Sequence, residues 1–500
     1  MATDLTRIGE KARKEPDLVF TSLYHHISDV DNLRACYGSL EAKKATGVDG
    51  VTKEEYGRNL EENLQEVSAR LKRMDYRPSP SRRSYIPKPG SEKGRPLGIS
   101  CLEDKIVETA IKRTLEPIFE TVFEDSSYGY RPGCSQHKCL DVMGRTIQQK
   151  PVNYVVEADI KGFFDNVSHE WMIKFLRHRI GDERVIRLII RMLKSGIMED
   201  GLVSASDQGT PQGSILSPLL SNIYLHYALD LWFSRRVSRQ SRGEAYYFRF
   251  ADDFLACFQY KDDAGNFQGH LEGRLERFGL QLSKEKTHCI EFGRFARENA
   301  CKRGEKPKEF TFLGFTHYCG KTKEGHFKVK RRTSRKKLGQ SLSKFTDWAR
   351  NARHVLKKGE MLRHARIRVL GHLSYYAITD NLERCQYYVY RTEQILFKWL
   401  NRKSQRRAYT WGSFSQALAW VGWPKTRVRK DLNPCRRAEA DRRTHRGAGC
   451  MGKPLVRFCE GQESNCDREE ILWHRRESRR KQRKQTSSCS HGRLLSTRKK

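Results

Sequence analysis

Two adjacent acids, Asp252 and Asp253, interrupt an aromatic and apolar segment, "YYFRFADDFLACF" (246–258). A third acid, Asp159, lies at the end of the β-branched segment "NYVVEADI" (153–160), which predicts a buried strand. If the first segment is a hairpin that pairs with this strand, three carboxylates converge and their repulsion raises their pKa values unless divalent cations neutralise them. Oxygen ligands favour Mg²⁺, and two such ions can hold the attacking and leaving oxygens of a phosphoryl displacement. Taken alone, an Asp-Asp pair more often marks a solvent-exposed turn.

The elements that must position these acids are helices and short strands. Residues 1–75 predict charged helices, broken by the two glycines of "ATGVDGVT" (45–52). Prolines and glycines divide 76–100 into short extended pieces, after which helical periodicity returns. After about 320 the pattern predicts basic helices with interleaved aromatic residues. From about 428 apolar periodicity fades, which predicts a tail that is poorly folded or organised by RNA.

The charge of the chain points to a polyanionic partner. Its 500 residues include 96 Lys and Arg against 60 Asp and Glu, a net charge of +36. This excess favours nucleic acid, because each cation that meets a phosphate releases counterions, although a merely basic or ribosome-associated protein is the alternative. The sequence shows no signal peptide, membrane span or CxxC pair, and its 14 cysteines are scattered. We therefore expect a cytoplasmic protein with reduced thiols and no membrane partner.

A series of ordered motifs resembles the group II intron-encoded reverse transcriptases, the intron maturases, over roughly residues 17–420. The motifs are "GVDGVT", "YIPKPGSEKGRPLGI", "SSYGYRPGCS", "ADIKGFFDNVSHEWM", "GTPQGSILSPLLSNIYL", "FRFADDF", "GLQLSKEKT" and "FTFLGF". The resemblance implies an α/β (α+β) right-hand polymerase fold, with fingers, a palm built on an antiparallel sheet, and a helical thumb or X domain. The expected divisions are 1–75 (N-terminal extension and start of the fingers), 76–320 (fingers and palm), 321–425 (thumb/X domain) and 426–500 (basic tail).

The same resemblance assigns roles to the acids. Asp159, Asp252 and Asp253 match the catalytic aspartates that bind two Mg²⁺ ions, and the backbone carbonyl of Ile160 is expected to complete a metal shell. Phe250 departs from the family, which usually has Tyr before "ADD". Loss of the phenol removes a hydrogen bond but keeps the packing, so we expect activity to survive.

Residues around the acids resemble a deoxynucleotide pocket. Phe164 matches the aromatic residue that would clash with a 2′-hydroxyl, although it could be ordinary core. Gln212 resembles the glutamine that packs against the incoming sugar and base, and Gly213 beside it lets backbone approach a ligand closely. Lys286 matches a basic residue near the active site of the family.

Two basic residues of the fingers resemble the family's triphosphate ligands. These are Lys88 and Arg95, whose charges would stabilise developing phosphate charge. The spacing here is one residue longer, so Lys93 is an alternative to Lys88, and all three also suit a solvated loop. The turn "FLGF", consisting of Phe312, Leu313, Gly314 and Phe315, resembles the primer grip, and its phenylalanines also suit core packing.

The basic region after 330 resembles the thumb and X domain. Residues expected to contact nucleic-acid phosphates are Arg331, Arg332, Lys336 and Lys337. Tyr375 and Tyr376 are expected to pack in the core rather than to stack on bases. Many relatives carry a C-terminal HNH endonuclease, but Cys435, Cys450 and Cys459 are spaced too widely for its zinc brace. We therefore predict no endonuclease.

The resemblance implies an RNA-directed DNA polymerase that binds its intron RNA as a splicing cofactor and copies it into DNA from a primer at a DNA target, using dNTPs. One alternative is a maturase only, an RNA-binding splicing factor whose polymerase is inactive. Other bacterial reverse transcriptases, from retrons, diversity-generating elements or defence systems, fit the long N-terminal extension and the X-like thumb less well. A viral RNA polymerase shares the acids, but Phe164 disfavours ribonucleotides.

Overall fold

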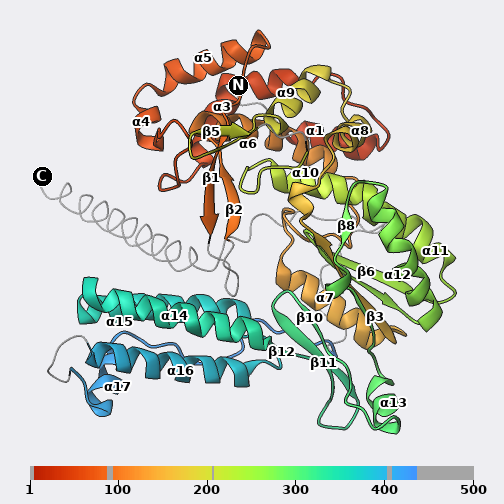
Figure 1. Cartoon of the computed structure of the whole chain (residues 1–500), viewed down its shortest axis with the longest axis vertical. Helices are drawn as coiled ribbons and strands as arrows, with labels where there is room; N and C mark the ends of the chain where they lie inside the picture. Colours follow the sequence, from red (N-terminus) through yellow and green to blue (C-terminus); the bar gives the residue numbers. More distant parts are fainter. Residues whose placement is uncertain (1–4, 87–93, 205–207, 403–407, 436–500) are drawn as a thin grey trace, which may run out of the picture. The chain divides into compact units, whose positions relative to one another are not determined.

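The N-terminal part of the chain is a layer of helices. In the computed structural model these are α1 (Thr6–Lys14), α2 (Tyr24–Ser28), α3 (Val30–Ser39), α4 (Lys53–Gly57), α5 (Leu60–Lys72) and α6 (Leu102–Phe119) (Figure 1). The structure describes residues 5–86, 94–204, 208–402 and 408–435, which belong to one compact unit. The predicted break at 45–52 is confirmed, since α3 ends at Ser39 and the next helix, α4, starts only at Lys53. Thr52 begins α4 through a capping box with Glu55.

The proline- and glycine-rich pieces after α5 contribute to a four-stranded sheet with the order β2-β1-β4-β5. Its strands are β1 (Ser81–Ile86), β2 (Arg95–Ile99), β4 (Ile197–Glu199) and β5 (Leu202–Ser204). β1 and β2 pair antiparallel, while β1 and β4 pair parallel. Lys88 and Lys93 fall between β1 and β2, outside the described residues.

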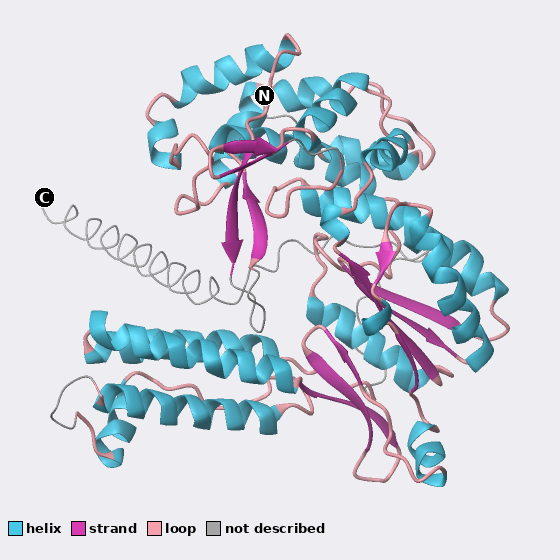
Figure 2. Cartoon of the chain, in the orientation of Figure 1, coloured by secondary structure: helices cyan, strands magenta, loops and turns pink. Residues whose placement is uncertain are grey.

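A five-stranded antiparallel sheet carries the acids, with the order β6-β7-β3-β8 and β9 also paired to β3 (Figure 2). The strands are β3 (Tyr154–Lys161), β6 (Ala245–Phe250), β7 (Asp253–Phe258), β8 (Gln281–Leu282) and β9 (His288–Glu291). Both segments predicted as strands are therefore strands, and they pair as expected.

Side-chain alternation divides this sheet into two faces. Val156 and Phe254 belong to the core that α12 covers, whereas Leu255 belongs to the core on the opposite face, where α7 packs. Asp253 alternates with Leu255, and Asp159 is its direct partner across β3 and β7. The two carboxylates therefore lie on the α7 face, at the end of the sheet.

The connections around this sheet are helical. The α-helices are α7 (Gln136–Gln149), α8 (His169–Arg177), α9 (Glu183–Leu193), α10 (Ser217–Leu225), α11 (Ser238–Gln240), α12 (Lys261–Glu276) and α13 (Ala296–Lys302). Short 3₁₀ turns span Phe163–Asp165 and Lys284–Lys286. After α10 the helix widens into π-helical turns at His226–Asp230 and Phe233–Val237, a local geometry that is rare and often lies at functional sites.

A third sheet, with the order β10-β11-β12, precedes the C-terminal helices. Its strands are β10 (Phe310–Phe312), β11 (Phe315–Lys321) and β12 (Phe327–Thr333), and the helices are α14 (Arg335–Val355), α15 (Lys358–Tyr376), α16 (Leu382–Asn401) and α17 (Trp411–Trp420). The prediction that the chain is helical from about 320 is wrong for β12. There Val329, Arg331 and Thr333 are buried in strict alternation, which is the period of a strand rather than of a helix.

The end of the last described segment, residues 428–435, packs near the residues that follow α15. Lys430 forms a parallel bridge with Ile378, and Leu432 is buried. The predicted loss of order from 428 is therefore wrong for 428–435, while 436–500 lie outside the described residues. Among the helices that are described, none combines the length and apolarity needed to cross a membrane.

Candidate active site

The carboxylates meet where β3 ends beside the β6–β7 hairpin. Phe250 pairs with Asp253, so Ala251 and Asp252 form the two-residue turn and Asp253 is the first residue of β7. Ala251 adopts φ 58°, a left-handed conformation that residues with a Cβ avoid, so the turn must be held by its surroundings. The pairing of Asp159 with Asp253 brings the third acid to the same edge.

Burial and mutual repulsion perturb both acids of the pair. Burial, reinforced by the charges of Asp252 and Asp159, raises the pKa of Asp253 to about 6. Burial also raises the pKa of Asp252, Asp159 adds to the effect, and Arg95 and Lys286 oppose it. Each added negative charge destabilises the others, so this edge of the sheet favours any cation that can reach it.

Lys286 reaches the acids from the 3₁₀ turn after β8. Its Nζ forms an ion pair with an Asp159 carboxylate oxygen although the lysine side chain is 68% exposed. Hydrogen bonding to Asp159 raises the pKa of Lys286. The Ser283 N–H donates to the Asp159 carbonyl at 2.8 Å and joins this turn to β3. Lys286 is therefore a predicted site residue that the fold brings directly onto an acid.

The donor set at this edge fits a hard divalent cation. As the described side chains stand, no group of three or more His, Cys, Asp or Glu surrounds one point, and Lys286 pairs with the Asp159 carboxylate. The Asp159 carbonyl faces β8, and successive carbonyls of an antiparallel strand alternate in direction, so the Ile160 carbonyl faces the β7 side. Carboxylates and a backbone carbonyl are the ligands that Mg²⁺ prefers.

Phe164 and Gln212 come from loops that contact each other and β2. The Thr210 N–H donates to the Phe164 carbonyl at 2.7 Å, and the half-buried Phe164 ring lies edge-on to Phe163. The Gly98 N–H of β2 donates to the Gln212 carbonyl at 2.6 Å. Gly213 follows with φ 117°, and a Cβ there would lie 2.6 Å from the Gly98 carbonyl oxygen. The close approach that Gly213 permits is therefore to β2.

Comparison with known proteins identifies this arrangement. A family model described as reverse transcriptase (RNA-dependent DNA polymerase) matches residues 86–317. Protein YkfC of Escherichia coli (strain K12) is 35% identical over 321 residues, covering 56% of this chain and 82% of YkfC. Group II intron-encoded protein LtrA of Lactococcus lactis subsp. cremoris is 39% identical over 222 residues, covering 44% of this chain and 37% of LtrA. The chain belongs to the group II intron-encoded reverse transcriptase and maturase family.

A more distant relative is nuclear intron maturase 2, mitochondrial, of Arabidopsis thaliana, 27% identical over 177 residues, covering 27% of this chain and 23% of the relative. The segment that matches the reverse transcriptase family, residues 86–317, includes Asp159, Asp252 and Asp253. This family has a right-hand polymerase fold. The mixed helices and antiparallel sheets of this chain agree with that fold.

The edge of the reverse transcriptase domain that faces the acids also carries Arg95 and Tyr130. Arg95 is exposed on β2, and its charge opposes the rise in the pKa of Asp252 that burial causes. Tyr130 was not predicted from the sequence. It is 50% exposed with φ 58°, and burial and the charge of Asp252 raise its pKa. The "YGY" motif around Gly129 is the signal that could have indicated it.

The "FLGF" segment is a two-residue hairpin turn between β10 and β11. Leu313 and Gly314 both have positive φ, while Phe312 and Phe315 are buried in the core. An open groove of about 720 Å³ runs beside this turn. It is lined by Asp253, Thr311, Leu313, Gly314, Thr316, Ser334, Arg335, Lys336, Lys337, Tyr375 and Tyr376. The turn and the start of α14 are therefore next to an acid.

The residues predicted to contact phosphates in the basic region differ in their exposure to solvent. Lys336 and Lys337 are exposed and line the groove. Arg332 is partly exposed and pairs with Glu309 at 2.7 Å. The prediction for Arg331 is wrong: its residue is only 2% exposed, and its Nη1 donates to the Leu432 carbonyl at 3.1 Å. Arg331 points inward because it shares the buried alternation of β12.

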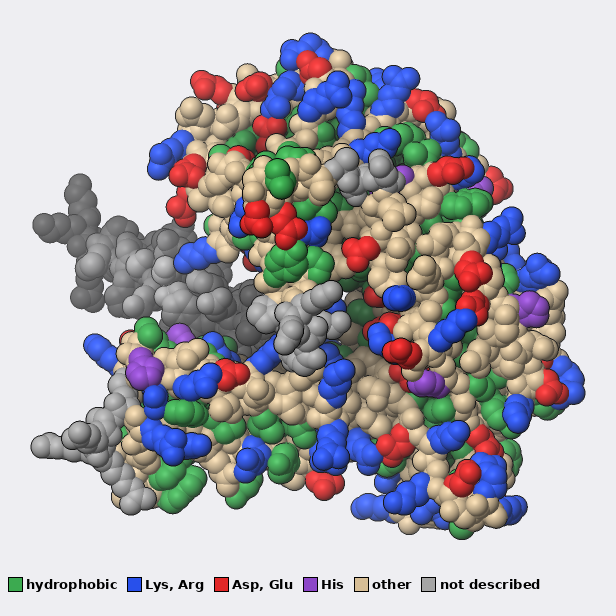
Figure 3. All heavy atoms as spheres, viewed as in Figure 1, with side chains coloured by type: hydrophobic (Ala, Val, Ile, Leu, Met, Phe, Trp, Pro, Cys, Tyr) green, Lys and Arg blue, Asp and Glu red, His purple; other side chains and the backbone are tan. Residues whose placement is uncertain are grey.

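Tyr375 and Tyr376 pack on Phe315, as the core prediction requires, but they also line the groove. On the face drawn in Figure 3, Lys and Arg side chains occur across the described chain, mixed with acidic ones. Charge on this face is thus spread over several elements.

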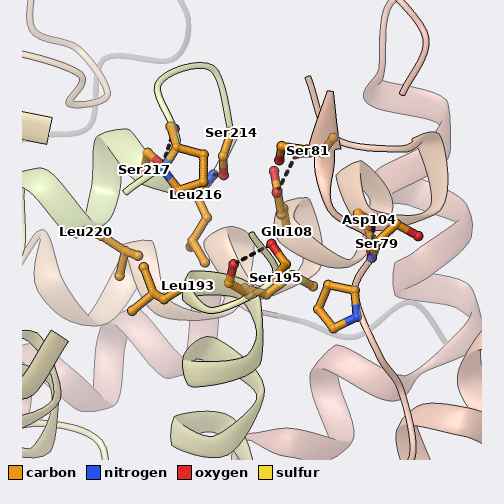
Figure 4. A pocket seen from close by; sticks show the side chains of 14 residues that line it. Ser79, Ser81, Asp104, Glu108, Leu193, Ser195, Ser214, Leu216, Ser217 and Leu220 are labelled. Atoms are coloured by element: carbon orange, nitrogen blue, oxygen red, sulfur yellow. Dashed lines mark hydrogen bonds between the residues drawn. The ribbon is translucent and has the colours of Figure 1, made fainter. Parts of the chain in front are cut away.

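Two buried acids on α6 accept hydrogen bonds from other segments, and one of them, Glu108, supports the loop that carries Gln212. Glu108 accepts the Ile215 N–H at 2.8 Å and the Ser100 hydroxyl at 2.9 Å, and Figure 4 shows its side chain facing the small cavity beside this loop. One turn earlier, Asp104 accepts the Tyr76 hydroxyl at 2.7 Å. Burial raises the pKa of both acids, that of Asp104 to about 7.

Sequence reasoning missed this pair, although a signal for it exists. Asp104 and Glu108 share the helical spacing of Ile111 and Leu115, all of them buried, so they belong to the apolar stripe of α6. Acids in such a stripe must find hydrogen-bond donors inside the fold.

We predict that Asp104→Asn becomes more stable relative to the wild type as the pH rises. The unfolded chain releases the Asp104 proton near pH 4, whereas the folded chain holds it to about pH 7. Ionisation of Asp104 therefore costs the folded wild type stability between these values, and the variant lacks this one contribution. Urea unfolding should show the difference moving in favour of the variant by roughly 1.4 kcal/mol per pH unit within that window. A constant difference would contradict the assignment, and Asp262→Asn, at an exposed position, is the control.

We also predict that Gly129→Ala destabilises the chain. The added Cβ would lie 2.2 Å from the Ala251 backbone nitrogen, so the turn that bears the acids must shift. Overpacking of this kind costs about 1–3 kcal/mol and should lower the urea midpoint. Gly371→Ala, in α15 with nothing within 4 Å of its Cβ, should leave the midpoint unchanged or raise it slightly.

Proposed function

We propose that this chain is an RNA-directed DNA polymerase that also binds group II intron RNA as a maturase. The observation that carries the proposal is the pairing of Asp159 with Asp253, with Asp252 in the adjoining turn, inside the segment that matches reverse transcriptases. The relatives support the maturase role, since LtrA is named a group II intron-encoded protein and a second relative a nuclear intron maturase.

The proposed reaction joins a deoxynucleotide to a DNA primer. The primer 3′-hydroxyl attacks the α-phosphate of a dNTP, a P–O bond forms, and pyrophosphate leaves. Two Mg²⁺ ions bound by Asp159, Asp252, Asp253 and the Ile160 carbonyl would supply the charge that activates the hydroxyl and stabilises the leaving group. The carboxylates hold their positions at the sheet edge, and Lys286 and Arg95 add positive charge where phosphate charge develops.

Other residues select the substrates. Phe164 sits one short turn after β3 and is proposed to exclude a 2′-hydroxyl, while Gln212 lies against the incoming nucleotide. Lys88 is proposed as a triphosphate ligand from the sequence alone. The Leu313–Gly314 turn would hold the primer strand, and Lys336 and Lys337 would contact template or primer phosphates along the groove.

The proposed role in intron splicing and mobility is supported by the charge of the chain. The net charge of +36 suits a large RNA, and the proposed partners are group II intron RNA and a DNA target that supplies the primer. A maturase with an inactive polymerase would have no need to keep three acids together at an electrostatic cost, which argues against that alternative.

We predict that the wild type extends a DNA primer on an RNA template with Mg²⁺ and dNTPs, and that Asp252→Ala lowers the rate by on the order of 10³-fold or more. Asp262→Ala is the matched control, because this aspartate is exposed on α12. Primer extension on a gel measures the rate, and anisotropy of labelled intron RNA measures binding. Tight RNA binding without extension by the wild type would refute the polymerase and leave the splicing cofactor.

We predict that Phe164→Ala increases the use of ribonucleotides. Removing the ring opens space for a 2′-hydroxyl, so the ratio of kcat/KM for dNTP to that for NTP should fall by about 10–100-fold. Phe295→Ala, at an exposed position, is the control. An unchanged ratio would show that Phe164 is ordinary core.

A further inference from the structure

Arg249 is a fully buried cation one residue before the end of β6. It is 0% exposed, and all of its guanidinium nitrogens have acceptors. The acceptors are Asp230 Oδ1 (2.7 Å from Nε), Asp230 Oδ2 (2.6 Å from Nη2), Ser127 Oγ (2.7 Å from Nη2), Asn222 Oδ1 (3.0 Å from Nη1) and the Ala251 carbonyl (3.0 Å from Nη1). A buried charge requires compensation of this kind.

The ion pair between Arg249 and Asp230 is bidentate and comes from two different parts of the fold. Asp230 ends the π-helical turn His226–Asp230, and it is also buried. The planar guanidinium presents its donors in a rigid fork, so two parallel bonds to one carboxylate fix its orientation. The Arg249 guanidinium therefore has a fixed orientation relative to the π-helical turn His226–Asp230.

This fixed guanidinium holds the turn that bears Asp252. Its Nη1 donates to the carbonyl of Ala251, the residue in the strained left-handed conformation. Gly129 also packs against the turn, so closely that a Cβ would lie 2.2 Å from the Ala251 nitrogen. Asn222 links the two contacts, because its Oδ1 accepts from Arg249 and its Nδ2 donates to the Gly129 carbonyl at 2.7 Å.

The backbone of Arg249 is tied to the same segment. Its N–H donates to the Ser126 carbonyl, and its carbonyl accepts the Tyr128 N–H, both at 2.8 Å. The segment 126–130 therefore runs beside β6 as far as the turn, so that Ala251 is contacted at its carbonyl by Arg249 and near its nitrogen by Gly129.

We propose that Arg249 is a positioning residue for nucleotide transfer: with Asp230 and Asn222 it fixes the Ala251–Asp252 turn and so sets where Asp252 and Asp253 present their carboxylates. The proposal rests on the proposed polymerase function. Arg249 itself is enclosed by protein and acts through the turn. A purely structural role would instead affect how much protein folds and leave the chemistry of the folded fraction unchanged.

The test compares Arg249→Lys and Asp230→Asn with the wild type. Lysine keeps the charge but cannot make the bidentate bond or reach the Ala251 carbonyl at the same time. We expect the single-turnover rate per active enzyme to fall by about 10-fold or more, with active enzyme counted by burst amplitude. The Kd of primer–template, measured by anisotropy, should stay within about twofold, because the groove is untouched.

A second readout does not depend on polymerisation. Binding of Mn²⁺, followed by the electron paramagnetic resonance of the free ion, should weaken several-fold in both variants because the carboxylates are displaced. Arg179→Lys is the matched control, since Arg179 is also buried and donates to the backbone carbonyls of Leu18 and Pro16. This control should lose stability without changing Mn²⁺ affinity or the rate per active enzyme.

Each outcome decides the matter. Wild-type rates and Mn²⁺ affinity in folded Arg249→Lys and Asp230→Asn would overturn the positioning role. If neither variant folds, Asn222→Ala removes the bonds to Arg249 Nη1 and to the Gly129 carbonyl, and an unchanged Mn²⁺ affinity and rate there would overturn it. If the wild type fails to extend a primer, the polymerase proposal fails, while the Mn²⁺ comparison still tests whether Arg249 positions the acids.

Discussion

The antiparallel pairing of β3 with β7 places two carboxylates, Asp159 and Asp253, opposite each other at the end of a sheet, and Asp252 follows in the adjoining turn. Like charges so placed raise one another's pKa and destabilise the folded chain. Nearby cations counter that repulsion. Lys286 pairs with Asp159 from one side, and the charge of Arg95 acts on Asp252 from the four-stranded sheet.

The turn that bears Asp252 is strained, and rigid neighbours maintain it. Ala251 keeps a left-handed conformation because Arg249 binds its carbonyl and Gly129 leaves room for its nitrogen. The ion pair of Arg249 with Asp230 joins this turn to a π-helical segment. The strained Ala251–Asp252 turn thus keeps its conformation, and with it the position of the Asp252 carboxylate, only through contacts with these neighbours.

The loop with Gln212 and the β10–β11 turn are held by different parts of the fold. The first loop is bonded to Gly98 of β2 and to Glu108 of α6, so movement of the four-stranded sheet would carry Gln212 with it. The second turn shares a groove with Asp253 and the start of α14.

The sequence by itself determined the elements whose signals are local. A β-branched segment predicted β3, and an aromatic and apolar segment predicted the β6–β7 hairpin. The glycines of 45–52 predicted the break between α3 and α4, and the order of the motifs indicated the family. In contrast, the prediction that Arg331 contacts phosphate rested on the basic residues around it and was wrong, because the strand alternation of β12 buries this side chain. Only the tertiary structure decided that Glu108 holds Ile215, 107 residues away, and that Arg249 pairs with Asp230. Such partners depend on how helices and sheets pack, and a buried polar group is satisfied by whatever that packing brings near it.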